Sequence, residues 1–293
     1  MRSRPHISPL WLVFAAAVLW STGGLCIKAC SLPAVELAFG RSVLAGLTVA
    51  LLTYRRGFRL NRVTALASVL YAGTLLLFVV ATKLTTAANA IFLQYTAPLY
   101  ILLAEPLMFR ERLRPRDVAV VGVCLAGMAL FFVGELRPAD LQGNLAALAS
   151  GLCYAFFVLL LRHPDAAAVN RASSVVYGNL LLAAATAPAF FAGAGFALSG
   201  RDALILLYLG VVQIGVAYTL FTAGMARGVR SLDAGIVGYV EPILNPIWVF
   251  LLLGERPAPW ALAGGAIIIA AVACHGLLSA ATPAARGADP PPP

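Results

Sequence analysis

The sequence contains two matching segments, NAIFLQYTAPLYILLAEPLMFRERLRP (residues 89–115) and DAGIVGYVEPILNPIWVFLLLGERPAP (residues 233–259). They align without a gap at a separation of 144 residues. The alignment pairs Ala90 with Ala234, Tyr95 with Tyr239, Pro98 with Pro242, Glu111 with Glu255, Arg112 with Arg256, and Pro115 with Pro259. Two apolar segments can resemble each other by chance, but a gapless match that keeps Tyr, Pro and a Glu-Arg dipeptide favours an internal duplication. We therefore interpret the chain as two copies of one unit.

The composition indicates that the lipid bilayer is the solvent of this chain. Its 293 residues are 61% hydrophobic and only 11% charged, whereas a soluble domain is about 25% charged. The mean hydropathy is +0.90. The net charge of +9 does not indicate nucleic-acid binding, because the basic residues lie between apolar runs and form no basic face. We expect these residues to orient the chain in the membrane.

Ten apolar segments are separated by charged or Pro/Gly-rich breaks, and each is close to the roughly 20 residues that a membrane span needs. They are residues 9–28, 34–54, 63–82, 86–109, 116–134, 144–161, 172–193, 202–225, 231–253 and 258–279. The first segment resembles a signal peptide, but too few apolar residues precede its AAA triplet and the apolar run continues past it, so we expect a retained helix. The predicted organisation is a first repeat over residues 9–134, a second repeat over residues 144–279, and a disordered tail over residues 280–293.

The distribution of basic residues predicts the orientation of the spans. Five spans per copy is an odd number, so the second copy must enter the membrane from the side opposite to the first. With the N-terminus in the cytoplasm, fifteen Lys and Arg residues fall on the cytoplasmic side and five fall outside, and Arg41 lies within a span. Cytoplasmic loops carry such an excess. The sequence therefore predicts an all-α membrane protein, with ten transmembrane helices in two inverted five-helix repeats and both termini cytoplasmic.

Inverted repeats of this kind are typical of secondary transporters. In such proteins the substrate site lies near the membrane midplane between the repeats, and one half rocks against the other to give alternating access.

Three stretches resemble the EamA-type repeats of the drug/metabolite transporter superfamily. They are VLWSTGGL (residues 18–25), ANAIFLQYTAPLYILLAEPLMFRERL (residues 88–113) and GYVEPILNPIWVFLLLGERPAPWALAGGAIIIA (residues 238–270). The resemblance covers about residues 9–279. It implies a ten-helix inner-membrane carrier with a central cavity lined mainly by helices 1, 3, 4, 6, 8 and 9. It also implies transport, often outward, of amino acids, other small metabolites or drugs. The first repeat departs from the pattern, with Phe109-Arg110 where the second has the usual Leu253-Gly254.

Glu241 is the strongest functional candidate, because an ionisable group in mid-membrane is costly and should face the bundle interior or a wet cavity. Here it could carry a proton or bind a substrate amine; the alternative is a structural acid bonded to a neighbouring helix. Asn245 lies one turn further on the same face. Pro242 and Pro246 remove backbone hydrogen bonds and predict a bend, which either opens a polar notch or only shapes packing. The first repeat keeps the first proline, as Pro98, but has no acid at the position of Glu241.

Aromatic and amide side chains within the spans complete the candidate site. Trp20 lies too deep for the interfacial aromatic belt, and the tyrosines could form an aromatic cavity wall or act as packing filler. The predicted substrate-binding residues are Trp20, Ser21, Asn89, Gln94, Tyr95, Tyr154, Gln213, Tyr218, Tyr239, Glu241 and Asn245.

The remaining charged residues near the spans have simpler interpretations. Arg41 is expected to pair elsewhere or to reach a lipid headgroup, and Glu105 to snorkel or form a surface pair. Glu111 and Glu255 are each expected to anchor a loop together with the arginine that follows.

A membrane enzyme and a non-transporting receptor or scaffold are the competing classes. All three histidines fall at span ends or in loops, and the sequence has no HExxH motif and no P-loop. The five cysteines are an odd number without a C-x-x-C motif, so they predict neither a disulfide framework nor a metal site. A static scaffold has no need of inverted repeats.

The preferred interpretation is a non-enzymatic, secondary-active transporter of the inner membrane that exports a small metabolite such as an amino acid. Its expected partners are a small-molecule substrate and the lipid bilayer, with no nucleic acid, cofactor or metal. The sequence is compatible with proton coupling and with either a monomer or a homodimer.

Overall fold

The computed structural model of the chain describes residues 8–131, 140–193, 198–253 and 259–281. These residues form helices and contain no strand, which confirms the all-α prediction. The first half comprises α1 (Pro9–Trp20), α2 (Gly23–Ala29), α3 (Ala34–Thr53), the short 3₁₀ turn Tyr54–Arg56, α4 (Arg62–Leu84), α5 (Ala87–Gln94), α6 (Ala97–Phe109) and α7 (Pro115–Phe131). The second half comprises α8 (Leu141–Arg162), α9 (Pro164–Ala167), α10 (Ala172–Ala192), α11 (Gly200–Leu207), a π-helical segment (Tyr208–Val216), α12 (Ala217–Ala226), α13 (Ser231–Gly238), α14 (Val240–Leu253) and α15 (Pro259–Ala281).

Eight helical segments of the described chain are long and apolar enough to cross a membrane. They are Pro9–Ala29, Ala34–Arg56, Arg62–Leu84, Ala87–Phe109, Leu141–Arg162, Ala172–Ala192, Gly200–Ala226 and Ser231–Leu252. The other two expected spans coincide with α7, which has 17 residues, and with α15, which contains the shorter apolar stretch Leu262–Gly276. The chain is thus a multi-pass helical protein, and the count of ten spans stays a prediction. Residues 280 and 281 still belong to α15, and the rest of the expected tail, 282–293, lies outside the described residues.

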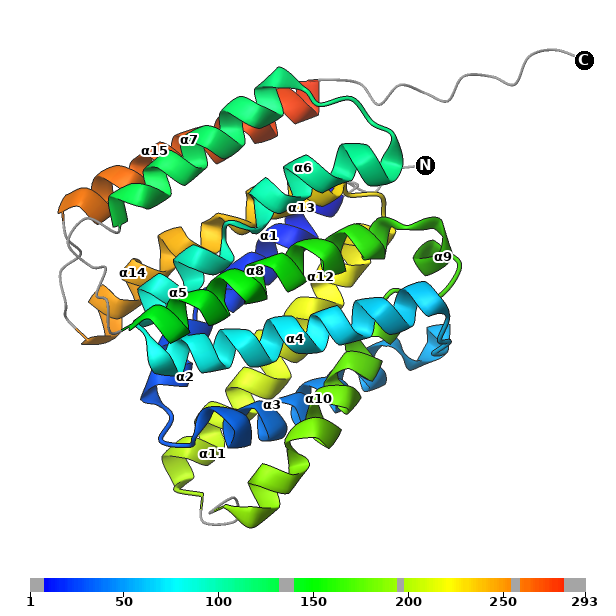
Figure 1. The fold of residues 1–293 in the computed structure, drawn as a ribbon, viewed down its shortest axis with the longest axis vertical. Coiled ribbons are helices and arrows are strands. Elements are labelled where there is room, and N and C mark those ends of the chain that lie inside the picture. Colours follow the sequence, from blue (N-terminus) through cyan, green and yellow to red (C-terminus); the bar gives the residue numbers. More distant parts are fainter. Residues whose placement is uncertain (1–7, 132–139, 194–197, 254–258, 282–293) are drawn as a thin grey trace, which may run out of the picture.

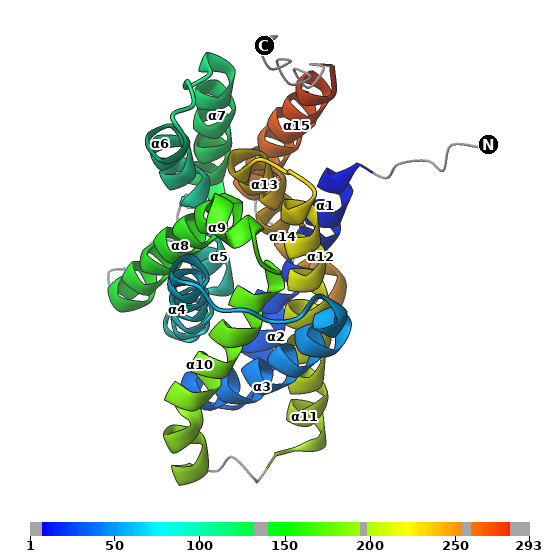
Figure 2. The same cartoon turned by 90° about the vertical axis from the view of Figure 1, so that its right-hand side faces the viewer.

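Helix contacts follow the pattern that a two-fold axis between two five-span units would produce. Spans at equivalent places in the two halves pack on each other: α3 against α10, α6 against α13, and α7 against α15. The pairing of α4 with α8 is matched by the pairing of α12 with α1. Figures 1 and 2 show the paired α7 and α15 at one side of the bundle and α3 and α10 at the other.

Three spans are interrupted near their middle. The first breaks at Ser21–Thr22, between α1 and α2; the second at Tyr95–Thr96, between α5 and α6; and the third at Tyr239, between α13 and α14. Pro98 and Pro242 lie in the first turn of the helix that follows each of the last two breaks, where a missing N–H costs no hydrogen bond. Pro246 lies within α14. Broken helices at mid-membrane depth leave backbone groups free to line a cavity.

A fourth irregularity was not predicted from the sequence. Residues Tyr208–Val216 form a π-helix between α11 and α12. Such wide turns are rare and occur frequently at functional sites. Gln213 lies on this segment.

Candidate functional site

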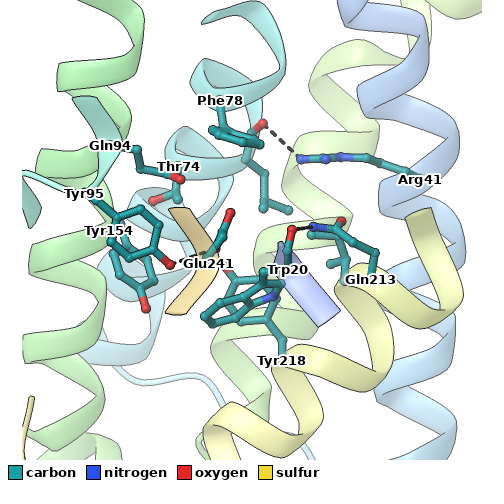
Figure 3. Close-up of a pocket in the computed structure, with 12 residues that line it drawn as sticks. Trp20, Arg41, Thr74, Phe78, Gln94, Tyr95, Tyr154, Gln213, Tyr218 and Glu241 are labelled. Carbon is teal, nitrogen blue, oxygen red and sulfur yellow. Dashed lines mark hydrogen bonds between the residues drawn. The ribbon is translucent and has the colours of Figure 1, made fainter. Parts of the chain in front are cut away.

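A small cavity lies between the two halves near the three helix breaks (Figure 3). Its volume is about 30 Å³, which is room for about two water molecules. The lining residues are Trp20, Arg41, Thr74, Leu75, Phe78, Gln94 and Tyr95 from the first half and Tyr154, Gln213, Ile214, Tyr218 and Glu241 from the second. Seven of the eleven predicted binding residues therefore meet around one small cavity.

Glu241 and Tyr95 form the polar contact at the two broken helices. The Tyr95 hydroxyl donates a hydrogen bond of 2.7 Å to Glu241 Oε2, and both side chains are buried. The contact joins the break between α5 and α6 to the first turn of α14. It depends on close approach at Gly238, because a Cβ atom there would lie only 3.0 Å from the Tyr95 ring. The tyrosine fixes one carboxylate oxygen, and no described residue donates a hydrogen bond to the other.

Arg41 reaches the same cavity from α3 and corrects the expectation that it pairs elsewhere or contacts a headgroup. Its side chain is 1% exposed. Nη2 donates a hydrogen bond of 3.1 Å to the Leu75 carbonyl, whereas Nε and Nη1 have no partner among the described residues. Figure 3 shows Arg41 and Gln213 on one side of the cavity, Tyr95 and Tyr154 on the other, and Glu241 between them. A cation with two unsatisfied donors thus lines the same cavity as an acid.

Two amides are anchored at the cavity by specific hydrogen bonds. Gln213 Nε2 donates to the Trp20 carbonyl over 3.3 Å, at the break after α1. Gln94 Nε2 donates to the Ser150 hydroxyl over 2.7 Å, and that hydroxyl donates to the Thr74 carbonyl over 2.8 Å. These bonds fix the amide nitrogens and leave the Gln213 oxygen without a partner among the described residues.

Several other polar atoms near the cavity are buried and have no hydrogen-bond partner within the described part of the chain. The Trp20 indole nitrogen and the Tyr154 hydroxyl join the two Arg41 donors and the Gln213 oxygen in this group. A buried polar group without a partner costs about 1–3 kcal/mol, and such groups are rare in native structures. A concentration of them around one cavity is what a site for a polar solute requires.

Aromatic rings cover one wall of the cavity. Trp20 packs against Tyr218 with ring centroids 4.7 Å apart, against Phe221 at 5.2 Å, and edge-on against Tyr154 at 6.1 Å. Tyr218 in turn contacts Tyr71 edge-on at 4.8 Å. The aromatic wall draws on both halves of the chain, and any opening of the cavity on this side must separate these rings.

Four predicted binding residues lie away from the cavity. The Ser21 hydroxyl donates to the Val18 carbonyl and accepts from the Trp248 indole at 2.7 Å. Asn89 bonds to Thr85 and is part of the capped first turn of α5. Tyr239 is fully buried against the Tyr95 ring, with centroids 5.8 Å apart. The Asn245 amide oxygen lies near Gly24 of α2.

Five lining residues were missing from the sequence-based set: Arg41, Thr74, Leu75, Phe78 and Ile214. Arg41 carried the one detectable signal, a charge within a span. The other four, which are apolar residues and one threonine, are indistinguishable from packing residues in a hydrophobic sequence.

A buried ion-pair network closes the end of the bundle at which α6 and α8 end and α13 begins, at the right of Figure 1. Glu105 is fully buried and pairs with Arg162 at 3.0 Å and with Arg230 at 2.9 Å. Arg230 also pairs with buried Asp117 at 2.6 Å, and Arg162 pairs with Glu111. The expectation that Glu105 forms a surface pair is wrong, because Arg162 and Arg230 of the second half cover it.

Glu111 likewise pairs with arginines of the second half instead of the adjacent Arg112. The corresponding prediction for Glu255 lies outside the described residues. The network therefore connects the C-terminal part of α6 and the start of α7 in the first half to the end of α8 and the start of α13 in the second.

Comparison with known proteins gives a family match along nearly the whole chain. The model of the "EamA-like transporter family" matches twice, over residues 7–133 and 141–276. The threonine/homoserine exporter RhtA of Escherichia coli is 30% identical over 189 residues, covering 62% of this chain and 60% of the relative. The aromatic amino acid exporter YddG of Ancylobacter novellus is 29% identical over 216 residues, covering 70% of each chain. A solved crystal structure matches with a TM-score of 0.79 and 24% identity over 93% of this chain and 97% of the other, a likeness of fold.

Proposed function

The chain belongs to the EamA-like transporter family of membrane proteins, and on this premise we propose that it is a secondary-active exporter of an amino acid or a closely related metabolite. It acts in the inner membrane by alternating access, with both termini in the cytoplasm. The observation that carries the proposal is the pair of opposite charges, Arg41 and Glu241, on one buried cavity.

The chemistry of the cavity supports an amphoteric substrate. Arg41 has two free N–H donors for a carboxylate, a contact in which charge strengthens the hydrogen bond. Glu241 is placed to accept from an ammonium group, with Tyr95 holding one of its oxygens. The unsatisfied Trp20 and Gln213 atoms and the aromatic wall suit the rest of such a solute. The similarity to YddG, an aromatic amino acid exporter, and to RhtA, a threonine/homoserine exporter, supports the same substrate class.

The small volume of the cavity supports a transport cycle in which the halves separate. Space for about two waters does not hold an amino acid, so substrate entry requires movement of one half against the other. We infer that the end closed by Glu105, Arg162 and Arg230 is cytoplasmic, because the arginine-rich loops lie at that end. The network then acts as a cytoplasmic gate, together with the aromatic wall of the cavity.

Counterflow in proteoliposomes tests the proposed function. Vesicles loaded with one unlabelled amino acid or uncharged metabolite at a time are assayed for uptake of its labelled form. We expect saturable exchange for at least one amino acid, and a loss of about tenfold or more in Arg41→Gln, since a charge-assisted hydrogen bond is worth about 1.5–3 kcal/mol.

Arg112→Gln serves as the matched control, because Arg112 is exposed in the loop before α7, and it should keep wild-type exchange. Exchange restricted to solutes without charged groups would contradict the proposal, as would full activity of Arg41→Gln.

A further inference from the structure

A second recess lies away from the cavity of Arg41 and Glu241, next to α9. It is an open groove of about 580 Å³, lined by Arg55, Arg56, Gly57, Arg59, Ala167, Ala168, Val169, Asn170, Arg171 and Ala226. A narrower slot of about 120 Å³ continues from it between α3, α10 and α12. The two recesses share Arg56, Asn170, Arg171 and Ala226. Figure 2 shows α9 between α8 and α10.

The groove is strongly positive and contains no acid. Four of its lining residues are arginines. None of these four forms an ion pair with a described residue. The ion pairs of the described chain involve Arg116, Arg162, Arg230 and two histidines instead. The neighbouring acid on α9, Asp165, approaches His163 at 3.8 Å. Four arginines without a counter-ion among the described residues give this recess a positive field that attracts an anion from outside the chain.

Arg171 is partly buried and lines both recesses. Its Nε donates a hydrogen bond of 2.6 Å to the Leu161 carbonyl, which fixes the guanidinium and leaves its terminal nitrogens for another partner. Burial lowers the pKa of Arg171, as expected for a cation removed from water without a nearby carboxylate. An anion in the groove relieves this cost.

The groove is built by hydrogen bonds between loops of the two halves. Asn170 Nδ2 donates to the Gly57 carbonyl over 3.2 Å, and Asn61 Nδ2 donates to the Asp165 carbonyl over 2.7 Å. Gly57 has φ +67°, a conformation that favours glycine. The loop after α3 is therefore held against the loop after α8, so the backbone that carries the arginines has a defined position.

The surroundings favour a lipid over a free anion. Leu51, Leu52 and Tyr54, which adjoin the arginines at the end of α3, are 64%, 56% and 60% exposed. Leu52 also lines the slot, together with Thr53, Ala172 and Ala223. Exposed apolar side chains next to arginines match the two parts of a phospholipid. Under the proposed orientation this end is cytoplasmic, where basic pockets between helices bind anionic headgroups.

We propose that this groove is a binding site for an anionic phospholipid, whose phosphate contacts Arg56 and Arg171 and whose glycerol region enters the slot. Because the site joins the loop after α3 to the loop after α8, the bound lipid stabilises the present arrangement of the two halves.

Thermal unfolding and native mass spectrometry of the delipidated protein in detergent test this site. The probes are phosphatidylglycerol, cardiolipin, phosphatidylcholine and, as a soluble anion, inorganic phosphate. We expect the anionic lipids to raise the melting temperature and to give discrete bound species, whereas phosphatidylcholine and phosphate do not. In Arg56→Gln/Arg171→Gln the apparent affinity for anionic lipid should fall by about tenfold or more.

The matched control is Arg112→Gln/Arg114→Gln, which removes two exposed arginines from the loop before α7 and should bind lipid like the wild type. Arg55→Gln/Arg59→Gln replaces two exposed groove arginines and gives a second reading if loss of Arg171 impairs folding; it too should weaken binding. Equal losses in the control and groove variants would overturn the proposal in favour of a general charge effect. Stabilisation by phosphate equal to that by lipid would overturn the lipid assignment.

Discussion

At the scale of single residues, two buried charges of opposite sign distinguish the candidate site. Arg41 and Glu241 are each nearly inaccessible to water and line one cavity. Arg41 belongs to the first half and Glu241 to the second, and the repeat partner of Glu241 is Ala97. The scaffold is therefore nearly symmetric while its polar lining is not. An asymmetric lining suits a solute with different groups at its two ends.

The Glu241 carboxyl group gives the first prediction. If it takes up and releases a proton during the cycle, Glu241→Gln, which cannot titrate, should abolish transport driven by a pH gradient in liposomes. The control Asp165→Asn removes an exposed carboxylate from α9 and should leave this flux unchanged. Wild-type proton-driven flux in Glu241→Gln would exclude proton coupling through this residue.

The Tyr95–Glu241 hydrogen bond gives a second prediction. Tyr95→Phe removes the donor but keeps the ring that packs on Tyr239. Since a hydrogen bond to a charged group is worth about 1.5–3 kcal/mol, we expect KM to rise by about tenfold, with the melting temperature nearly unchanged. Kinetics and thermal unfolding of the same preparation check this. A KM equal to that of the wild type would show that this bond does not position the acid for substrate.

The sequence predicted the chemistry of the site better than its geometry. Glu241, Tyr95 and Gln213 were identifiable as polar or aromatic groups within apolar spans. Asn245 was placed with Glu241 by regular helical spacing, but its side chain lies near Gly24 of α2, because the direction of each face also depends on how the helices pack. Arg41 was noticed, but its burial depends on α4, which supplies the Leu75 carbonyl, and no local pattern reports such a contact.

At the scale of helices, the breaks in the spans organise the molecule. Pro242 and Pro246 predict a bend near Tyr239, because proline cannot donate the helical hydrogen bond. The π-helix at Tyr208–Val216 had no such signal, because its sequence, YLGVVQIGV, is an ordinary apolar run. The family resemblance predicts the overall fold. The ends and irregular turns of individual helices depend on tertiary packing and are not predictable from it.

The C-terminus of α6 supplies a stability prediction. Arg110 follows α6 with φ 54°, in the left-handed region that favours glycine, and the second repeat has Gly254 at the matching position. Relief of this strain by Arg110→Gly should stabilise the fold by about 1 kcal/mol, or roughly 2–4 °C in melting temperature. Arg110→Ala keeps the Cβ atom and should give no such gain, so equal melting temperatures of the two variants would contradict the strain argument.

At the scale of the whole molecule, the proposed transport cycle requires the ion-pair network at the end proposed to be cytoplasmic to break and re-form. Glu105 has two arginine partners from the other half. Removing its charge leaves two partly buried arginines without their shared counter-ion, although Arg162 keeps Glu111 and Arg230 keeps Asp117, and this weakens the network that joins the two halves. Glu105→Gln should therefore shift the protein toward conformations open at the cytoplasmic end.

Pulsed electron–electron double resonance, which measures the distance between two spin labels, tests for this shift. Spin labels are placed at Leu113 and Arg227, both exposed near that end, in a variant whose five cysteines are replaced. We expect a longer and broader distance distribution in Glu105→Gln than in its parent, and no change in the loop control Arg112→Gln. Identical distributions in all three would exclude the network as a gate.

The central claim is that one buried cavity binds both charged ends of an amino acid, and competition by blocked derivatives tests it most directly. For the amino acid that exchanges best, its methyl ester lacks the carboxylate that Arg41 binds, and its N-acetyl form lacks the ammonium that Glu241 binds. We predict that each derivative competes with labelled substrate at least about tenfold more weakly than the parent, since each loses one charge-assisted hydrogen bond. Competition by both derivatives as strong as that by the parent amino acid would contradict the account.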